Sequence, residues 1–309
     1  MSKIAITGIT GKSGTFFWKK ILENEELVKK TWPEGINLIS RDISKLENIE
    51  KKSLKTFFYS GDLTDKKLTD SFCENCDTLV HIAGIHWSVP LVESAIKCGI
   101  KRLILVHTTG IYSKYKAAGE EYRNIDSKIY QLAKKNNIAL TILRPTMIYG
   151  DISDKNVVVF IRIVDKFKLV PTVNGAKYEL QPVHCKDLGQ AYYDVLMHPE
   201  ICNGHDYVLS GGRPITLRNM FEEIAKNLGV KRKYVSCPFI IAYLGAWLIY
   251  ILSFTRKDFR EKVQRLVEPR VYSHEAATRD FGYSPMNFEE GIIGEVKQYL
   301  ASKSKNKNK

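Results

Sequence analysis

Three glycines near the start of the chain, Gly8, Gly11 and Gly14, have the spacing of a phosphate-binding turn. An apolar run at residues 3–6 precedes the turn, and an apolar, aromatic stretch at residues 16–22 follows it at helical spacing. Strand, turn and helix in this order are the context in which such glycines bind a dinucleotide. Gly8 permits the tight turn, Gly11 lets backbone approach the pyrophosphate, and Gly14 lets the helix pack closely on the strand.

The cofactor site that we expect extends from this turn to the ends of later strands. The helix after the turn offers free N–H groups and the positive end of its dipole to phosphates. Asp62 either accepts from the adenine amino group or caps the helix that follows it. The candidate cofactor-binding residues are Thr7, Gly8, Thr10, Gly11, Lys12, Ser13, Gly14, Arg41, Asp62, Leu63, Ala83 and Gly84.

The pair Arg41 and Asp42 follows the second apolar run, where the adenosine ribose of a dinucleotide would lie. An acid there would bond the two ribose hydroxyls, whereas an arginine would pair with a 2′-phosphate. Because Arg41 comes first, we expect NADP as the preferred cofactor, and the adjacent Asp42 keeps NAD open as the alternative.

The scaffold for these residues is indicated by apolar runs that alternate with helical patterns. Continuous apolar runs of strand length between amphipathic helices are typical of an α/β fold with a doubly wound parallel sheet. Ligands of such a sheet bind at the carboxyl ends of its strands. We predict strands at 3–6, 36–40, 56–60, 78–84, 103–106 and 140–145, and helices at 90–98 and 115–136.

The composition suits a globular protein with a sizeable core, since the chain has 309 residues of which 44% are hydrophobic. No signal-peptide pattern precedes the first apolar run, so we expect a cytoplasmic protein. Six cysteines in this length do not make a disulfide framework. We expect Cys73 and Cys76 to be a reduced pair at the surface, and we expect no metal site.

The net charge of +13 is scattered along the chain, so we expect no nucleic-acid partner. Four lysines come from the last eight residues, and the absence of apolar residues there predicts a disordered basic tail at 301–309. The remaining positive charge could face an anionic membrane surface, a phosphorylated substrate or solvent.

Several motifs occur in an order that resembles one protein superfamily. They are the turn Thr7–Gly14, Gly61-Asp62-Leu63, His81-x-Ala83-Gly84, Leu143-Arg144-Pro145 through Ile148-Tyr149-Gly150, Gln181 to Leu188, and Arg279 to Pro285 with Glu289 to Ile292. The chain resembles the short-chain dehydrogenase/reductase superfamily in its extended and atypical branches, the NAD-dependent epimerase/dehydratase and NAD(P)-binding group. The resemblance covers residues 3 to about 300.

This resemblance implies a Rossmann fold with a smaller C-terminal substrate lobe. The Rossmann domain would comprise residues 1–150 and about 182–210. The substrate lobe would comprise residues 151–181 and 211–300.

The resemblance also implies a catalytic tyrosine whose pKa is lowered by a lysine four residues on, with a Ser or Thr orienting the substrate oxygen. Tyr112 and Lys116 have this spacing, and Thr108 or Thr109 would orient the oxygen. Lys116 would also hold the cofactor ribose. The alternative is that Tyr112 is a packing or pocket residue, because the family usually places a longer loop between the strand end and its catalytic tyrosine.

Three later residues are candidate substrate contacts. His184 lies either near the nicotinamide or beside the helix cap Asp187 as a hydrogen-bonded structural histidine. Arg213 and Arg270 are either anchors for an anionic substrate, since a guanidinium suits bidentate phosphate binding, or solvated surface residues.

An uncharged segment at residues 234–255 contains no Asp, Glu, Lys, Arg or His and has basic flanks. Its length alone would admit a membrane span. Its proline, tyrosines and tryptophan suit a membrane interface better than a hydrocarbon centre. We keep three alternatives: a buried helix of the lobe, an interfacial anchor on a cytoplasmic membrane face, and a span.

Two functions fit these observations. The first is an NAD(P)-dependent oxidoreductase, epimerase or dehydratase that acts on a hydroxyl or carbonyl of a small substrate, for which the family suggests a nucleotide sugar. The second is a non-catalytic NADP-binding protein with a structural or redox-sensing role, associated with a membrane or another protein.

Overall fold

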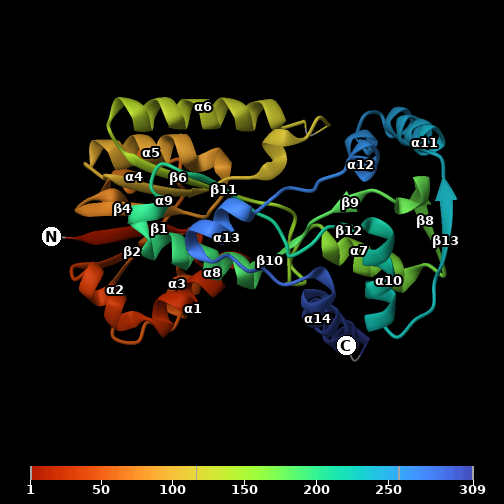
Figure 1. The fold of residues 1–309 in the computed structure, drawn as a ribbon, viewed down its shortest axis with the longest axis horizontal. Helices are drawn as coiled ribbons and strands as arrows, with labels where there is room; N and C mark the ends of the chain where they lie inside the picture. The colour runs from red at the N-terminus through yellow and green to blue at the C-terminus, as the bar shows by residue number, and fades with distance from the viewer. Residues whose placement is uncertain (1, 116, 257, 308–309) are drawn as a thin grey trace.

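A seven-stranded parallel sheet forms the centre of the larger part of the molecule, with the strand order β11-β6-β5-β4-β1-β2-β3 (Figure 1). The computed structural model describes residues 2–115, 117–256 and 258–307. The strands are β1 Lys3–Thr7, β2 Gly35–Ser40, β3 Thr56–Ser60, β4 Cys76–His81, β5 Arg102–Val106, β6 Ala139–Pro145 and β11 Asp206–Leu209. The order changes direction between β1 and β4, where open parallel sheets bind their ligands.

Helices cover both faces of this sheet (Figure 1). One face packs against α4 Lys66–Cys73, α5 Ser88–Lys97 and α6 Gly119–Lys135. The other packs against α1 Lys12–Glu23, α2 Glu25–Thr31, α3 Ile43–Glu47 and α8 Cys185–Met197. Strands β1, β2, β4, β5 and β6 are mostly buried, as expected for parallel strands between two layers of helices, whereas β3 at the edge is only half-buried. The predicted doubly wound α/β fold is confirmed.

The smaller lobe has its own apolar core and lies beside the carboxyl ends of the strands (Figure 1). Its strands form short pairs rather than one sheet: β10 with β7, β12 with β9, and β13 with β8. The strands are β7 Ile148–Tyr149, β8 Leu169–Val173, β9 Glu179–Leu180, β10 Val183–His184, β12 Ile215–Thr216 and β13 Lys233–Cys237. The helices are α7 Val157–Lys166, α10 Leu217–Asn227, α11 Phe239–Leu252, α12 Arg260–Leu266 and α14 Phe288–Lys307.

Two of the predicted elements differ from the structure by three residues or more at one end. The strand predicted at 78–84 is β4, which ends at His81, so Ala83 and Gly84 belong to the loop after it. The helix predicted from residue 115 is α6, which begins at Gly119. Before it, residues 109–112 form the short 3-10 helix η2.

The C-terminal region differs from the prediction in two places. Helix α13, Glu275–Phe281, falls within the range predicted for the lobe, yet Ala277 and Tyr283 belong to the core beneath the large sheet. The predicted basic tail is helical as far as Lys307, because α14 continues into it. Lys303 near its end bonds Asp165 of α7, which holds this last part of the helix to the lobe.

The Cys73 and Cys76 thiols are buried, not at the surface as expected. They lie in the core under α4, where burial raises the pKa of Cys76 to about 12. Both thiols are free and protonated at neutral pH.

Helix α11 contains most of the uncharged segment and spans 14 residues, about 21 Å at the usual rise. In the described part of the chain, no helix is both long and apolar enough to cross a membrane. The buried-helix alternative is also wrong, because Ala246 is the one buried residue of α11.

Candidate functional site

A cavity of about 1160 Å³ opens between the carboxyl ends of the sheet strands and the lobe. From the sheet side it is lined by residues that follow β1, β2, β4 and β5, and from the lobe side by residues such as Lys155, Gln181 and Arg270. Because both parts of the molecule contribute walls, a ligand held by the sheet would face side chains of the lobe.

The glycine turn has the close contacts that its residue types predict. Gly8 has a φ of +78°, and a Cβ there would lie 2.7 Å from the backbone nitrogen of Ala83. A Cβ on Gly14 would lie 2.1 Å from the carbonyl oxygen of Gly8. The turn is closed by the Gly11 N–H, which donates to the Gly8 oxygen over 3.0 Å. Side chains at positions 8 and 14 would therefore push the turn apart.

Helix α1 begins immediately after this turn, at Lys12, with its first residues facing the cavity. Gly11 precedes it as a cap without a side chain, so the backbone N–H groups of the first turn are open to a ligand. Thr10, Lys12 and Ser13 also line the cavity there. This arrangement suits the pyrophosphate of a dinucleotide.

Thr7 holds the turn to the end of β4. Its hydroxyl lies 2.7 Å from Nδ1 of His81 and accepts from the Ile82 N–H. His81 Nε2 lies 3.0 Å from the Gly84 carbonyl oxygen, and burial lowers the pKa of His81 to about 3. The imidazole is therefore neutral, and it bonds Thr7, which lines the cavity.

The residues after β2 and β3 lie at another wall of the cavity, which Arg41, Asp42, Asp62 and Leu63 line together. The Asp42 carboxylate accepts from the Ser44 hydroxyl over 2.6 Å and faces Lys45. Asp62 accepts from the Thr64 N–H over 2.9 Å, which lowers the pKa of this carboxyl. Arg41 is exposed and forms no ion pair or hydrogen bond with any described residue. Its charge nevertheless contributes to lowering the pKa of the neighbouring Asp62.

Only some of the residues that were predicted to be catalytic line the cavity. Thr108 and Thr109 line the cavity, but the Thr108 hydroxyl accepts from the Gly110 N–H and the Thr109 hydroxyl donates to the Pro145 oxygen. Tyr112 does not line the cavity; it is 50% exposed and its ring contacts Tyr272. Lys116 lies outside the described residues.

A different tyrosine reaches the cavity. Tyr122 of α6 lines it, and its ring packs against Gly110, where a Cβ would lie 3.2 Å from Cε2 of the ring. Burial is the main cause of the raised pKa of this phenol, so it stays protonated at neutral pH. The sequence held no signal for this residue, because a single tyrosine on a predicted helix has no distinctive spacing.

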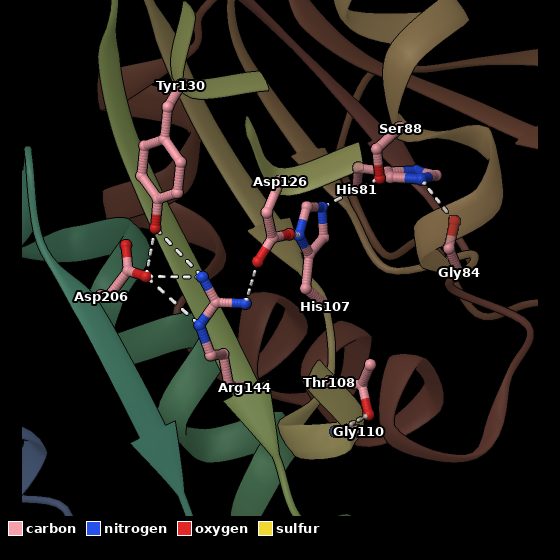
Figure 2. A network of polar contacts seen from close by, with 10 residues as sticks. All are labelled: His81, Gly84, Ser88, His107, Thr108, Gly110, Asp126, Tyr130, Arg144 and Asp206. Carbon is pink, nitrogen blue, oxygen red and sulfur yellow. Dashed lines mark hydrogen bonds and ion pairs between the residues drawn. The ribbon is translucent and has the colours of Figure 1, made fainter. Parts of the chain in front are cut away.

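Helix α6 is held to the sheet by a polar network that is buried at His107, Asp126 and Arg144 and exposed at Tyr130 and Asp206 (Figure 2). Asp126 of α6 accepts over 2.6 Å from both His107 Nδ1 and Arg144 Nη1. Arg144 also donates to Asp206 over 2.7 Å and to the Tyr130 hydroxyl over 3.0 Å. Burial alone would raise the pKa of Asp126, but His107 and Arg144 outweigh it and the pKa is lowered. The network joins α6 to β6 and β11 and to the residue after β5.

Two of the three predicted substrate residues lie away from the cavity lining. His184 accepts from the Lys186 N–H as the cap of α8, and its ring packs between Phe16 and Tyr149. Burial lowers the pKa of His184 to about 4, so this histidine is neutral. Arg213 is exposed and pairs with Glu289 over 2.8 Å.

The third, Arg270, lines the cavity, together with Arg265 from α12. The Nε atoms of both guanidiniums are buried without a hydrogen-bond partner in the described part of the chain. Burial, followed by the charge of Arg265, lowers the pKa of Arg270 to about 10. The nearby Glu268 is occupied by the Ser113 hydroxyl and the Lys114 N–H. Arg265 also pairs with Glu261 over 3.8 Å, and the charge of Glu268 acts on Arg270, so this wall presents two partly compensated guanidiniums to the cavity.

No protein-family model matches the sequence. The chain is 26% identical over 170 residues to a 2-alkyl-3-oxoalkanoate reductase from Stenotrophomonas maltophilia strain K279a, covering 52% of this chain and 51% of that one. The chain thus spans about half the length of that reductase. It is 22% identical over 245 residues to a UDP-glucose 4-epimerase from Vibrio cholerae, covering 72% and 74% of the two chains.

Solved structures share the fold over nearly the whole chain. A dTDP-glucose 4,6-dehydratase from Streptomyces venezuelae with NAD bound has a TM-score of 0.74 at 15% identity, covering 98% of both chains. An NADPH-dependent quinone oxidoreductase from Escherichia coli, complexed with NADPH, has a TM-score of 0.71 at 16% identity, covering 96% of this chain and 99% of that one. The resemblance to the extended branch of the short-chain dehydrogenases/reductases, predicted from the sequence, is confirmed.

Proposed function

We propose that this chain is an NAD(P)-dependent oxidoreductase of the epimerase, dehydratase or reductase type, acting on a hydroxyl or carbonyl of a small anionic substrate. One observation carries the proposal: a single cavity joins the glycine turn after β1 to the guanidiniums of Arg265 and Arg270. A dinucleotide on the turn would extend along the strand ends toward a wall that attracts negative charge. The similar reductase and epimerase support the same class of reaction.

The cofactor residues have distinct tasks in this proposal. The N–H groups at the start of α1 hold the pyrophosphate, and Gly8 and Gly14 keep the turn closed. The nicotinamide, when bound, supplies or accepts a hydride. Lys12 adds a positive charge beside the phosphates, where it lines the cavity.

NADP is the cofactor that the wall after β2 favours. Arg41 has a guanidinium with no described partner, whereas the Asp42 carboxylate already bonds Ser44. A free guanidinium pairs well with a 2′-phosphate. Titration of the purified protein with NADPH and NADH, followed by calorimetry, tests this preference.

The proton that accompanies hydride transfer needs a donor in the cavity. Tyr122 is a phenol that lines it, next to the loop that carries Thr108. In our proposal Tyr122 donates its proton to a substrate carbonyl oxygen, and in the reverse direction its oxygen accepts that proton. The assignment of this role to Tyr112 stays a prediction, which the matched Tyr→Phe variants at the two positions separate.

We propose a nucleotide sugar as the first substrate class to test. The support is the pair of half-buried guanidiniums of Arg265 and Arg270, whose Nε atoms are buried without a described partner, because guanidiniums bind diphosphates in two-point geometry. Turnover should be assayed with UDP-glucose, dTDP-glucose, a 3-oxo acid and a quinone, the types of compound in the names of the similar proteins. The Arg265→Ala and Arg270→Ala variants should raise KM by roughly tenfold or more for the true substrate, since each charged hydrogen bond contributes about 1.5–3 kcal/mol.

A second candidate function is supported by the residues after β5. The Thr108 and Thr109 hydroxyls are both engaged with backbone, and Tyr112 points its ring at Tyr272. A chain that holds NADP without a reacting tyrosine would act as a structural or redox-sensing protein. Tight NADPH retention with no oxidation by any substrate of the panel would favour this function over the enzyme.

A further inference from the structure

The outer side of α11 is a large apolar surface that no described part of the chain covers. Leu244 and Leu248 are 61% and 58% exposed, and neighbouring side chains extend the surface along the whole helix. The exposed apolar residues of this helix and of the loop after it are together called the α11 surface. They are Ile240, Ile241, Leu244, Trp247, Leu248, Ile249, Ile251, Leu252 and Phe254. Contiguous apolar patches of this kind mark an interaction site.

The loop that follows α11 adds to this surface. Phe254 is 86% exposed and has a φ of +51°, and Thr255 after it has a φ of +65°. Left-handed backbone at two residues other than glycine is unfavourable, by about 1–2 kcal/mol for each one. The fold therefore maintains an exposed phenylalanine in an unfavourable backbone conformation at the end of the helix.

The sequence that leads into α11 and out of it carries charge of one sign up to Asp258, which pairs with Arg260 of α12. Between Glu223 and Asp258 the sequence contains no acidic residue. Lys231 and Lys233 before the helix and Arg256 after it are exposed and form no ion pair with a described residue. An apolar helix with cations at both ends matches the layers of an anionic membrane, because apolar groups enter the acyl region while cations meet the headgroups.

The position of α11 in the molecule also leaves it accessible to a flat surface such as a membrane. Figure 1 shows α11 at the outer end of the lobe, far from α2 and the N-terminus. Helix α11 contacts α12, whose Arg260 lies over the ring of Tyr250 at 3.9 Å and over the ring of Trp247, which is still 39% exposed, at 4.6 Å. Because Arg265 of α12 lines the cavity, the α11 surface is connected to the candidate site through one short helix.

We propose that α11 docks this protein in the plane of an anionic lipid bilayer, with the α11 surface inserted at the boundary between headgroups and acyl chains. A helix of about 21 Å is too short to span a hydrocarbon core of about 30 Å, but it can lie flat in the interface. Trp247 and the two tyrosines of the helix favour the same depth. Docking does not depend on the function of the cavity, since none of the α11 surface lines it.

The test is flotation of the full chain with vesicles of phosphatidylcholine containing phosphatidylglycerol. We expect the protein to float with these vesicles, and the double variant Leu244→Glu/Leu248→Glu to lose at least roughly tenfold in affinity. At low salt, the affinity of the Lys231→Gln/Lys233→Gln variant for these vesicles should fall roughly fivefold or more for each charge removed. Its affinity for vesicles of pure phosphatidylcholine should change little. Trp247 fluorescence should shift to the blue on binding, and Trp247→Phe should abolish that shift.

The matched control is Leu27→Glu, which changes a leucine 48% exposed on α2 at the opposite end of the molecule. It should bind vesicles as the unchanged chain does. Circular dichroism and NADPH binding of each variant separate a folding failure, or a failure of the proposed function, from loss of docking. The proposal is overturned if the unchanged chain does not bind the vesicles, or if the Leu244→Glu/Leu248→Glu variant binds them with the same affinity as the unchanged chain. If the unchanged chain does not bind lipid but forms a dimer, and Leu244→Glu/Leu248→Glu dissociates that dimer, the α11 surface would instead be the contact with a second copy of the chain.

Discussion

Asp126 of α6 and Arg144 of β6 form an ion pair 2.6 Å long whose two side chains are 8% and 3% exposed. The pair connects the helix that carries Tyr122 to the strand that ends at the lobe. Since His107 donates to the same carboxylate, the loop after β5 is held by the same group. The geometry of the candidate site thus depends on an interaction that lies outside the cavity.

Replacing Asp126 with Asn should destabilise the protein by about 3 kcal/mol, because Arg144 loses a buried counter-charge. Urea unfolding followed by circular dichroism measures the loss. The control is Glu93→Gln, which removes an exposed ion pair between α5 and Lys128 of α6. That change should cost less than about 1 kcal/mol. Equal losses in the two variants would contradict the role of the buried pair.

Gly14→Ala should abolish or severely weaken NADPH binding. Its new Cβ would lie 2.1 Å from the Gly8 oxygen, and relief requires the turn to open. Gly294→Ala in α14 is a suitable comparison, since a Cβ there meets no atom within 4 Å. That variant should bind the cofactor normally and gain up to about 1 kcal/mol of stability from helix propensity. Calorimetric titration with NADPH distinguishes the two.

Arg41→Ala should weaken the binding of NADPH by roughly tenfold or more and leave the affinity for NADH almost unchanged. The reason is the loss of a charge-assisted contact to the 2′-phosphate, worth about 1.5–3 kcal/mol. Asp42→Asn should affect both cofactors little if its carboxylate serves Ser44 and Lys45 alone. A parallel fall in NADPH and NADH affinity for Arg41→Ala would show that the arginine does not read the phosphate.

Tyr122→Phe should lower kcat by about 10²-fold or more if its phenol moves the substrate proton. Tyr112→Phe should leave kcat unchanged, because the Tyr112 ring is not part of the cavity lining, although it contacts Tyr272, which is part of it. The measurement is turnover with the substrate found in the panel, at equal cofactor saturation. Undiminished turnover in Tyr122→Phe with a loss in Tyr112→Phe would restore the original assignment.

Glu295 of α14 should make stability depend on pH. Its side chain is fully buried, accepts from the Gly150 N–H over 2.7 Å, and has a pKa raised from 4.5 to about 9 by burial and by Asp154. The folded protein therefore holds a proton that the unfolded chain releases above its own pKa, so stability falls as pH rises from about 4.5 to 9.

Glu295→Gln should remove this dependence. At pH near 5 the variant should match the unchanged chain, and at pH near 8 it should be more stable by about 1 kcal/mol or more, since one pKa unit corresponds to about 1.4 kcal/mol. Thermal unfolding across a pH series measures it. Parallel curves for the two proteins would refute a protonated Glu295.

The sequence was most informative where one residue type fits one backbone geometry. Gly8 and Gly14 predicted a turn whose contacts the structure reproduces, and buried strands such as β5 were placed to within a residue. Arg265 and Tyr122 were missed because their roles arise from tertiary packing. The sequence around a single residue of a helix does not indicate whether its side chain faces a cavity or solvent.

The alternatives at Tyr112 and His184 had the same origin. A four-residue Tyr–Lys spacing and a histidine at a strand end are compatible with either catalysis or packing, and only the three-dimensional surroundings decide. For His184 those surroundings are Phe16, Tyr149 and the start of α8.

The last strand of the large sheet has a consequence for synthesis of the chain. Asp206 of β11 forms an ion pair with Arg144 of β6, from which it is separated by 62 positions in the sequence. The ribosome therefore synthesises the first elements of the lobe after β6 and before β11. Until β11 leaves the ribosome, the edge of β6 has no neighbour, and unpaired strand edges promote aggregation. The nascent protein is therefore most exposed to misassembly while the lobe is being translated, after the glycine turn and the first six strands are already complete.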